Sequence, residues 1–392
     1  MATRGGAGRS AGGGLRVALV LGASVGGIGS HVRDLAAHCV ARGDRVVVAG
    51  PAQTGVHFGF TDTGARFVPL PARSASAARM PQTRRTLRRV LTEADVVHSH
   101  GVKAAALTNL TLATLPAGSR PRHVVTLHNA LLADGLRGLM AGFVERLAVR
   151  RADLVLGASA DLVQRALEAG AKHAVPCRVP APPRPSAEYA EPADRDAVRA
   201  TIRATLHAEV GLDAADDDVR LVLAVGRLTS QKSYPLLLDA VDILGSAQPF
   251  PAMRVLIAGE GPERAALAAG IARRELPVTL LGHRGDVADL LNAADAFVLC
   301  SRWEARALVV QEALRAGTPV VATAVGGIPE LVGDAALLVP WSDPHALAAA
   351  LHRVLTDKAL EDELRQAGPA QAATWPTAAE ALDATRAWYA AD

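Results

Sequence analysis

Two glutamates stand eight residues apart in the segment 301–323, SRWEARALVVQEALRAGTPVVAT. Glu304 precedes an apolar run of helical period, and Glu312 lies inside it, about 12 Å farther along the axis at 1.5 Å per residue. The start of such a helix offers unpaired N–H groups and a positive dipole end, which suit a diphosphate. Two carboxylates flanking an anion site suit the hydroxyls of a nucleotide-sugar, a hexose near Glu304 and a ribose near Glu312. Taken alone, two such acids are more often solvated surface residues.

Two cations occupy a comparable position in LVLAVGRLTSQKSY. Arg227 follows an apolar, strand-like run, and Lys232 comes five residues later, where the next helix starts. Two cations at the carboxyl end of a strand can neutralise a leaving diphosphate without a metal ion. An isolated Arg and Lys would be ordinary surface residues, but at the same sheet edge as Glu304 they form a coherent set.

The first half of the chain offers glycines and histidines at strand ends. In LGASVGGIGSHVRDLA, Gly26 and Gly27 allow the backbone to approach a ligand closely before a helix begins. His98 and His100 end one apolar run, and His128 follows another in VVTLHN. A lone histidine is more often a hydrogen-bonded structural group than a catalyst. Among the three, His128 is the best candidate for contact with a transferred sugar.

The elements that must position these residues alternate along the whole chain. Short Val- and Leu-rich runs such as LRVALVL, ADVVHSH, VRLVLAVG and DAFVLCS are separated by amphipathic helical segments. This alternation predicts parallel sheets covered by helices on both faces, and two such series predict two doubly wound domains. Ligands of open parallel sheets bind beyond the carboxyl ends of the strands. The helix of Ala307–Ala316 is expected to end at Gly317, in a left-handed cap.

The domain boundaries follow from composition. Residues 1–14 are glycine-rich and are expected to be a disordered tail, with LRVALVL as a first buried strand rather than a signal peptide. The proline-rich segment 179–196, VPAPPRPSAEYAEPADRD, predicts an extended linker. We therefore expect an N-terminal domain over 15–185, a C-terminal domain over 186–374, and a last helix over 375–392.

Composition and charge narrow the classes of protein. At 392 residues, two domains are expected, and no apolar run reaches the roughly 18 to 20 residues of a membrane span. Cys39, Cys177 and Cys300 are far apart and lack metal-ligand spacing, which favours a reducing cytoplasm over disulfides or structural zinc. Residues 1–190 carry 24 Lys and Arg against 11 Asp and Glu, and the remainder carries 18 against 28. Halves of opposite charge suggest different partners.

Taken together, these segments resemble family 4 of the glycosyltransferases, enzymes of the GT-B fold. The matching pieces are GGIGSHVRDLA, VVTLHN, AVGRLTSQKS, IAGEGPER, LLNAADAFVLCSRWE and EALRAGTPVVATAVGGIPELV, together with the E-x7-E pair. The resemblance covers about residues 15 to 390. It implies two Rossmann-like domains with the active site between them, an NDP-sugar donor, transfer of a hexose-type sugar with retention, and a final helix that crosses back to the first domain. It also implies no metal or other cofactor.

The resemblance assigns roles to the residues above. Gly26 and Gly27 would lie in the glycine loop on the acceptor side, and His128 near the donor sugar. Glu304 would hold the sugar hydroxyls. The donor contacts would be completed by the diphosphate ligands Arg227 and Lys232, by Arg306, Ala307 and Leu308 at the helix start, and by the ribose ligand Glu312.

Two departures from the family pattern bear on the donor sugar. Many relatives have Glu-Gly-Phe-Gly where this chain has Glu304-Ala305-Arg306-Ala307, and the Asn-Gly-Val-Asp that often follows Val-Pro is replaced by VPAPPRP. Arg306 adds a cation beside the expected donor pocket, where it would help to bind an acidic sugar or would simply be solvated.

Other functions remain open on the same architecture. The alternatives are a catalytically silent sugar-nucleotide-binding protein and a nucleotide-sugar epimerase, although the sequence pattern expected of the epimerase is absent. A nicotinamide dehydrogenase is disfavoured because the second strand, DRVVVAGP, ends in Gly-Pro rather than an acidic residue, and the glycine loop is not a clean G-x-G-x-x-G.

A basic segment, RMPQTRRTLRRVL, is predicted to be a helix with one apolar side. Arg84, Arg85, Arg88 and Arg89 form i,i+4 pairs of like charge, which an anion would offset. Because the first domain receives the acceptor in this family, we expect the segment to meet anionic membrane lipid or a phosphorylated, lipid-linked acceptor. A merely solvated basic face is the alternative. The protein is thus expected in the cytoplasm or on the inner face of the membrane, without a nucleic-acid partner.

Overall fold

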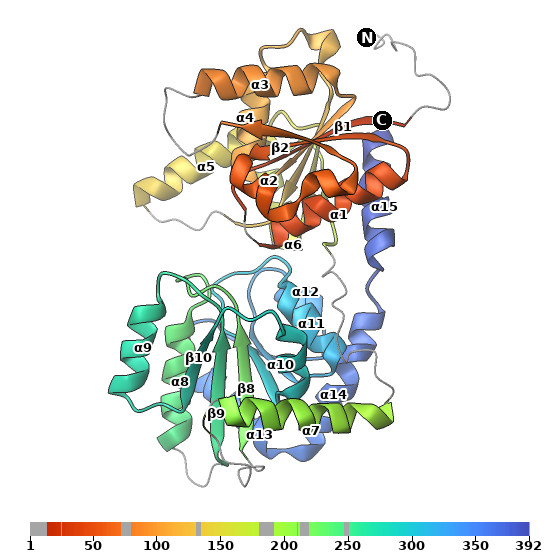
Figure 1. Ribbon diagram of the computed structural model, residues 1–392. Helices are drawn as coiled ribbons and strands as arrows, with labels where there is room; N and C mark the ends of the chain where they lie inside the picture. Colours follow the sequence, from red (N-terminus) through yellow and green to blue (C-terminus); the bar gives the residue numbers. More distant parts are fainter. Residues whose placement is uncertain are drawn as a thin grey trace. The chain divides into compact units, whose positions relative to one another are not determined.

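The computed structural model describes residues 14–24, 26–71, 80–130, 135–179, 192–209, 211, 219–246 and 251–391. The chain forms two compact units, Met1–Val179 with Thr377–Asp392, and Pro180–Pro376 (Figure 1). Each unit has its own parallel sheet, as the alternation of apolar runs predicts. The divisions fall at 179/180 and 376/377, whereas the sequence suggests 185/186 and 374/375.

Unit 1 is built on a seven-stranded sheet with the order β3-β2-β1-β4-β5-β6-β7, all of whose pairings are parallel. The order reverses between the neighbours β1 and β4, which is where doubly wound sheets bind ligands. The strands are β1 (Arg16–Leu21), β2 (Arg45–Pro51), β3 (Arg66–Leu70), β4 (Val96–His100), β5 (Arg122–Leu127), β6 (Leu154–Gly157) and β7 (Ala174–Pro176).

Helices cover both faces of this sheet. They are α1 (Gly27–Ala41), α2 (Ala52–Phe58), α3 (Met80–Glu93), α4 (Val102–Leu112), α5 (Gly135–Val149), α6 (Ala160–Glu168) and α15 (Ala378–Ala390). Alternate residues of β1 face opposite sides, so Leu19 packs with α1 and α15 while Ala18 packs with α3 and α4. The 3-10 turns Phe60–Thr63 and Ala117–Ser119 complete the described elements of the unit.

The last helix, α15, belongs to unit 1 although it ends the chain. Its Tyr389 side chain is buried in the core of that unit, and Leu382 packs beside it. Arg386 holds the buried Asp44 carboxylate through two hydrogen bonds of 2.6 and 2.8 Å. Thr377 and Glu380 form a reciprocal capping box at its start. Packing and capping together attach this terminal segment to the sheet that begins the chain.

Unit 2 is built on a six-stranded parallel sheet with the order β10-β9-β8-β11-β12-β13. The strands are β8 (Arg220–Val225), β9 (Met253–Ala258), β10 (Val278–Gly282), β11 (Ala296–Leu299), β12 (Val320–Thr323) and β13 (Leu337–Val339). The helices are α7 (Pro192–Glu209), α8 (Tyr234–Ser246), α9 (Arg264–Arg273), α10 (Val287–Ala293), α11 (Leu308–Ala316), α12 (Ile328–Val332), α13 (Pro344–Thr356) and α14 (Lys358–Ala373). Two apolar cores lie on its two faces.

The start of α7 corrects the expected linker. Residues 192–196 are helical rather than extended, because Pro192 occupies the first turn, where proline lacks no needed hydrogen bond. Residues 180–191 of the expected linker, like the tail 1–13, lie outside the described residues.

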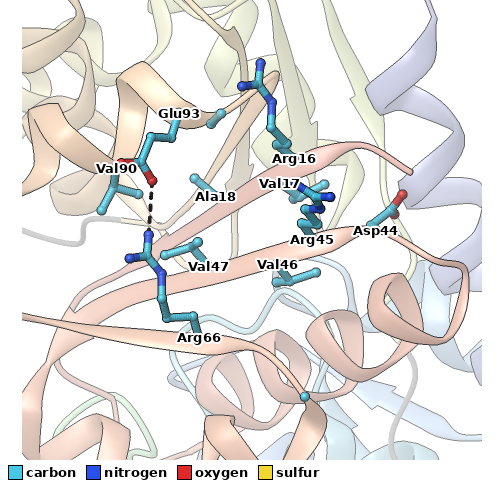
Figure 2. Close-up of a pocket in the computed structure, with 12 residues that line it drawn as sticks. Arg16, Val17, Ala18, Asp44, Arg45, Val46, Val47, Arg66, Val90 and Glu93 are labelled. Atoms are coloured by element: carbon cyan, nitrogen blue, oxygen red, sulfur yellow. Dashed lines mark hydrogen bonds and ion pairs between the residues drawn. The ribbon is translucent and has the colours of Figure 1, made fainter. Parts of the chain in front are cut away.

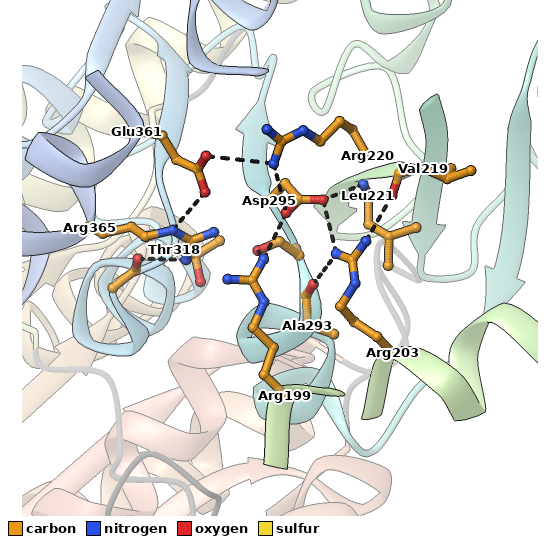
Figure 3. A network of polar contacts seen from close by, with 12 residues as sticks. Arg199, Arg203, Val219, Arg220, Leu221, Ala293, Asp295, Thr318, Glu361 and Arg365 are labelled. Carbon is orange, nitrogen blue, oxygen red and sulfur yellow. Dashed lines mark hydrogen bonds and ion pairs between the residues drawn. The ribbon is translucent and has the colours of Figure 1, made fainter. Parts of the chain in front are cut away.

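An ion network joins α7 to the sheet of unit 2 (Figure 3). Asp295, at the amino end of β11 and nearly fully buried, receives Arg199 at 2.7 Å and Arg203 at 3.0 Å, and Arg220 lies 3.5 Å away. Its carboxylate also accepts the backbone N–H of Leu221 at 2.7 Å. Arg199 and Arg203 both come from α7, so one carboxylate connects that helix to β8 and β11.

Candidate functional site

The carboxyl edge of the unit 2 sheet carries the predicted cations and glutamates. The loop 226–233 follows β8, and the loop 300–307 follows the neighbouring strand β11. Arg302 N–H donates to the Gln231 carbonyl at 2.8 Å, and the Gln231 side chain donates to the Trp303 carbonyl at 3.0 Å. These bonds hold the two loops side by side, with Lys232 on one and Glu304 on the other.

Lys232 and Glu304 meet directly. Lys232 Nζ lies 2.6 Å from Glu304 Oε1, and the Ser301 hydroxyl donates to the same oxygen at 2.8 Å. Both side chains are largely withdrawn from solvent, with exposed fractions of 18% and 12%. Arg227 is exposed at the start of the first loop and forms no ion pair with another of the residues that the structure describes. The carboxylate therefore neutralises Lys232 in a partly desolvated place, with the exposed Arg227 in the same loop.

Two glycines allow the backbone packing beneath this pair. Gly326 has φ +53°, and a Cβ there would lie 2.0 Å from the Glu304 carbonyl oxygen, which accepts the Gly327 N–H at 2.9 Å. Gly259 has φ +148°, and its Cβ would lie 1.9 Å from the Gly226 oxygen. No side chain fits at either point. Neither glycine was predicted to have a role, although Gly326 lies in AVGGIPELV and Gly259 in IAGEGPER, two segments that carry the family resemblance.

Helix α11 ends where the sequence predicts and begins one residue later than the expected Ala307. Ala307 is its N-cap residue, Leu308 its first residue, and no side chain caps it. Gly317 is left-handed, with φ 69° and ψ 23°, as expected of the C-terminal cap. Glu312 is buried on the helix body with 9% exposure, so it is not a solvated acid.

Arg306 lies against an aromatic ring. Its guanidinium carbon is 6.0 Å from the centre of the Trp375 ring, and that of Arg315 is 5.6 Å from the same ring. Distances of this order permit cation–π attraction. Trp375 could not be predicted as a partner, because it lies 69 positions away in a segment whose docking no local pattern specifies.

The glycine loop of unit 1 lies at the carboxyl end of β1. Gly26 is extended and forms the N-cap of α1, and Gly27 is the first residue of that helix. The Ser24 hydroxyl accepts the Gly29 N–H at 3.1 Å. Gly29 also packs against the Phe58 ring, which a Cβ would overlap at 2.0 Å. Nothing lies within 4 Å of the place where a Cβ on Gly26 would stand, so this glycine leaves open space beside the helix start.

A cluster of buried histidines lies at the same edge of unit 1. His98 and His100 end β4, His128 follows β5, and His31 comes from α1. His100 Nδ1 is 3.1 Å from His128 Nε2, and the His31 ring centre is 5.7 and 5.5 Å from those of His100 and His128. His98 lies between the hydroxyls of Tyr389, at 2.7 Å, and Thr126, at 2.6 Å. His31 was not predicted to join this cluster, because in the sequence it is one helical residue among many.

Burial keeps these imidazoles neutral. Burial lowers the pKa of His31 to about 4 and that of His128 to about 3. Repulsion between the two rings, were both to be protonated, also lowers the pKa of His128. Burial likewise lowers the pKa of His98 and of His100, and the neighbouring histidines lower both pKa values further. The Nε2 atoms of His31 and His100 have no hydrogen-bond partner among the described residues. A neutral imidazole can donate to or accept from a hydroxyl, which suits contact with a sugar or polyol.

The buried histidines predict acid-sensitive stability. An unfolded histidine titrates near 6.5, whereas His31 in the folded unit has a pKa of about 4, so between these values the unfolded chain binds more protons. The free energy of unfolding should be level above pH 7 and should fall between pH 6.5 and 4, by about 3 kcal/mol for His31 alone. Urea unfolding at pH 7.5, 6, 5 and 4.5 measures this. The His31→Gln variant should show a shallower fall. Equal slopes for the two proteins would contradict the assignment.

The described cavity of unit 1 lies at the opposite edge of its sheet. It measures about 530 Å³, and the amino ends of β1, β2 and β3 line it with Arg16, Arg45 and Arg66 (Figure 2). Arg16 is paired with Asp95 at 2.6 Å and Arg66 with Glu93 at 3.2 Å. Because ligands of doubly wound sheets bind at the carboxyl edge, we do not place the acceptor here.

Comparison with known proteins identifies the family. Residues 26–182 match the family described as "Glycosyl transferase 4-like domain", and residues 219–357 match "Glycosyl transferases group 1". The phosphatidyl-myo-inositol mannosyltransferase of Mycolicibacterium smegmatis is 30% identical over 363 residues, which span 87% of this chain and 83% of that protein. The chain belongs to family 4 of the glycosyltransferases.

Two further likenesses accompany this assignment. The D-inositol 3-phosphate glycosyltransferase of Corynebacterium diphtheriae is 36% identical over 180 residues, an alignment that spans 42% of this chain and 41% of that relative. The structure of Anabaena Alr3699/HepE in complex with UDP and glucose superposes with a TM-score of 0.78 at 19% identity, covering 96% of this chain and all of that one. The fold of this family member is therefore GT-B, as expected.

The free cysteines and the helices complete the description. Cys39, Cys177 and Cys300 are buried and free, and burial raises the pKa of Cys300 to about 12, which disfavours a reactive thiolate. Among the described helices, none combines the length and the apolar character needed to cross a bilayer.

Proposed function

We propose that this protein moves a hexose-type sugar from an NDP-sugar to an acceptor hydroxyl with retention and without a metal ion. The observation that carries the proposal is the contact between Lys232 and Glu304, at the carboxyl edge where Arg227 is also presented. Donor binding would place the diphosphate against Lys232 and Arg227, and the Glu304 carboxylate would then be available to the sugar hydroxyls. The Anabaena neighbour crystallised with UDP and glucose supports a donor of this class.

Retention is proposed to follow from attack on the face that the leaving group vacates. The acceptor oxygen forms a bond to the anomeric carbon as the bond from that carbon to the phosphate oxygen breaks. The leaving phosphate oxygen takes the acceptor's proton, so the products are the glycoside and the NDP. The protein's part is to position both substrates and to stabilise the charge that develops on the diphosphate.

The remaining residues receive supporting roles in this proposal. Gly26 and Gly27 leave room for an acceptor beside the start of α1, and neutral His128 contacts a hydroxyl of the transferred sugar. Glu312 accepts hydrogen bonds from the ribose, and Ala307 and Leu308 present the N-terminus of α11 to the diphosphate. If the Arg306 side chain moves away from the Trp375 ring, its guanidinium would favour a donor with an acidic sugar. If it stays on the ring, it has no part in donor binding.

The acceptor is proposed to be a phosphorylated or lipid-linked polyol. The names of two relatives, a D-inositol 3-phosphate glycosyltransferase and a phosphatidyl-myo-inositol mannosyltransferase, both contain inositol. The arginines of α3 in the same unit, Arg84, Arg85, Arg88 and Arg89, suit an anionic acceptor or the membrane that carries it. We place the protein on the cytoplasmic side of the membrane for this reason.

The test is a donor and acceptor panel in the presence of EDTA. UDP- and GDP-linked hexoses are incubated with inositol, an inositol phosphate or phosphatidylinositol, and NDP release is measured with and without acceptor. The proposal expects acceptor-dependent release for at least one pair, and NMR of that product should show the donor's anomeric configuration. Donor binding without turnover by any acceptor would favour the silent sugar-nucleotide-binding protein. Inversion, or a strict need for divalent metal, would overturn the mechanism.

The ribose assignment predicts a separate effect. Glu312→Gln should weaken binding of the preferred NDP by about tenfold or more, because the hydrogen bonds from the ribose would then go to a neutral amide instead of a charged carboxylate. Calorimetric titration with bare NDP measures this without any contribution from the sugar. Glu363→Gln on α14 is the control, since that residue is exposed and has no assigned role in donor binding. Equal NDP affinity in wild type and Glu312→Gln, with both proteins folded, would remove Glu312 from the donor site.

A further inference from the structure

Helix α5 of unit 1 presents large apolar side chains to solvent. Leu139 is 75% exposed, Met140 64% and Phe143 67%. Leu139 and Phe143 are four residues apart and Met140 adjoins Leu139, so the three side chains share one side of the helix. We call them the α5 apolar stripe. Farther along the same side the helix continues with the exposed Arg146, and Arg150 follows its end.

The other side of α5 is firmly packed. Ala148 and Val149 are fully buried, and the helix lies against α4. Glu145 is buried and pairs with Arg165 of α6 at 2.6 Å. Because the opposite side of α5 is packed against the rest of unit 1, the α5 apolar stripe faces away from the core of that unit. Contiguous exposed apolar surface on a folded protein marks a site of interaction with another protein, a membrane or an apolar ligand.

Helix α4 lies beside α5, and α3 lies beside α4. These two helices supply positive charge and almost no negative charge. On α3, Arg85, Arg88 and Arg89 are exposed, and on α4, Lys103 and Leu110 are exposed. Arg84 donates to the Leu110 carbonyl at 3.1 Å, which ties α3 to α4. Across the described residues of α3, α4 and α5, the acids are Glu93, at the end of α3, and the buried Glu145. The surface of these three helices is thus basic, with an apolar stripe at one side.

We infer that the α3–α4–α5 surface docks on an anionic lipid bilayer, with the α5 apolar stripe inserted among the lipids. Lipid phosphates would meet the arginines of α3 and the Arg146 guanidinium, while Leu139, Met140 and Phe143 enter the boundary between headgroups and acyl chains. Helix α5 begins at Gly135, seven positions after His128. Docking would therefore bring lipid close to the sheet edge that carries the buried histidines.

The charges argue against the other occupants. A second copy of this chain, paired through the same surface, would set the arginines of one protomer against those of its partner. A soluble polyanion would neutralise the arginines but would leave the apolar stripe in water. A bilayer with anionic headgroups satisfies both components. The inference does not depend on the transfer reaction, because lipid binding is measured without donor or acceptor.

Vesicle sedimentation with the full-length protein tests the inference. Wild type should bind phosphatidylglycerol-containing vesicles at least tenfold more tightly than pure phosphatidylcholine vesicles, and the difference should shrink at high salt. The triple variant Leu139→Ser/Met140→Ser/Phe143→Ser should lose affinity by about 100-fold. The variant Arg85→Ser/Arg88→Ser/Arg89→Ser should lose about fivefold per arginine. The matched control is Val56→Ser on α2, an 87% exposed apolar residue that stands beside α1.

A fluorescence measurement distinguishes insertion from mere attraction. Because Cys39, Cys177 and Cys300 are buried, the variant Phe143→Cys can be labelled selectively with an environment-sensitive dye. Anionic vesicles should shift its emission to the blue, and the same dye at Val56→Cys should not respond. Three results would overturn the inference: equal binding to neutral and anionic vesicles, an apolar triple variant that binds as wild type does, or a dimer that the triple variant converts to monomer without any vesicle binding.

Discussion

Replacing Lys232 by alanine is expected to lower kcat on the order of 100- to 1000-fold, because one fixed cation opposite the leaving diphosphate is removed from a partly desolvated site. The ion pair with Glu304 at 2.6 Å holds the ammonium group at the carboxyl edge of the sheet, where the proposal places the diphosphate. Initial rates of NDP release, measured with the donor that wild type uses, give the effect. Arg227→Ala should have an effect in the same direction. Lys232→Arg, which keeps the charge, should recover part of the lost rate.

The matched control is Lys358→Ala in the same unit, because that lysine is 68% exposed and pairs with Asp362 on the surface. It should retain activity within twofold. The Glu304→Gln variant should lower turnover as well, but it should alter relative rates among donor sugars while Lys232→Ala slows all of them. Turnover within twofold of wild type for both Lys232→Ala and Arg227→Ala would exclude the proposed chemistry.

The Asp295→Asn substitution is expected to lower the free energy of unfolding by about 3–5 kcal/mol, the usual consequence of leaving buried charges without their partner. Arg199, Arg203 and Arg220 all converge on this carboxylate, whose side chain is 4% exposed. Burial raises the pKa of Asp295, but Arg203, the Leu221 N–H and Arg199 outweigh it and hold the pKa below its ordinary value. The stabilising contribution should therefore be complete above the ordinary carboxyl pKa and disappear in stronger acid.

Urea unfolding monitored by fluorescence measures this loss. Asp242→Asn is the control, since its carboxylate is half exposed and lies 3.8 Å from Arg274, and it should change stability by less than about 0.5 kcal/mol. Because both arginines of α7 lose their partner, that helix should also become more sensitive to limited proteolysis. A stability change as small as that of the control would mean that the network contributes little.

The fold could be predicted from the sequence because its signal is local and repeated. Runs such as RVALVL and RLVLAV are buried on both sides, which only a covered parallel sheet allows, and they became β1 and β8. The tail helix was visible as an element, but its place beside α1 depends on tertiary contacts such as that of Arg386 with Asp44, 342 positions away. The start of α7 was missed because Pro192 tolerates the first turn of a helix as well as a linker.

In the candidate site, too, the features set by local sequence pattern could be predicted, and those set by tertiary packing could not. Lys232 and Glu304 could be placed together because both follow neighbouring strands of one sheet, where carboxyl ends converge. Glu312 and Gly317 followed from helical period and cap chemistry. The role of His31 could not be predicted, because its contact with His100 and His128 depends on how α1 packs over two strands. The contact of Arg306 with Trp375 likewise depends on tertiary packing alone.

Calorimetric titration of sugar nucleotides in EDTA is the most direct test that unit 2 holds a donor diphosphate at Arg227 and Lys232. Wild type should bind at least one UDP- or GDP-hexose without divalent metal, and Lys358→Ala should bind it equally well. The Arg227→Ala/Lys232→Ala double variant, folded by circular dichroism, should lose affinity at least 100-fold, because two charge-assisted contacts disappear. Failure of every sugar nucleotide to bind wild type, or equal affinity in the double variant, would contradict the account.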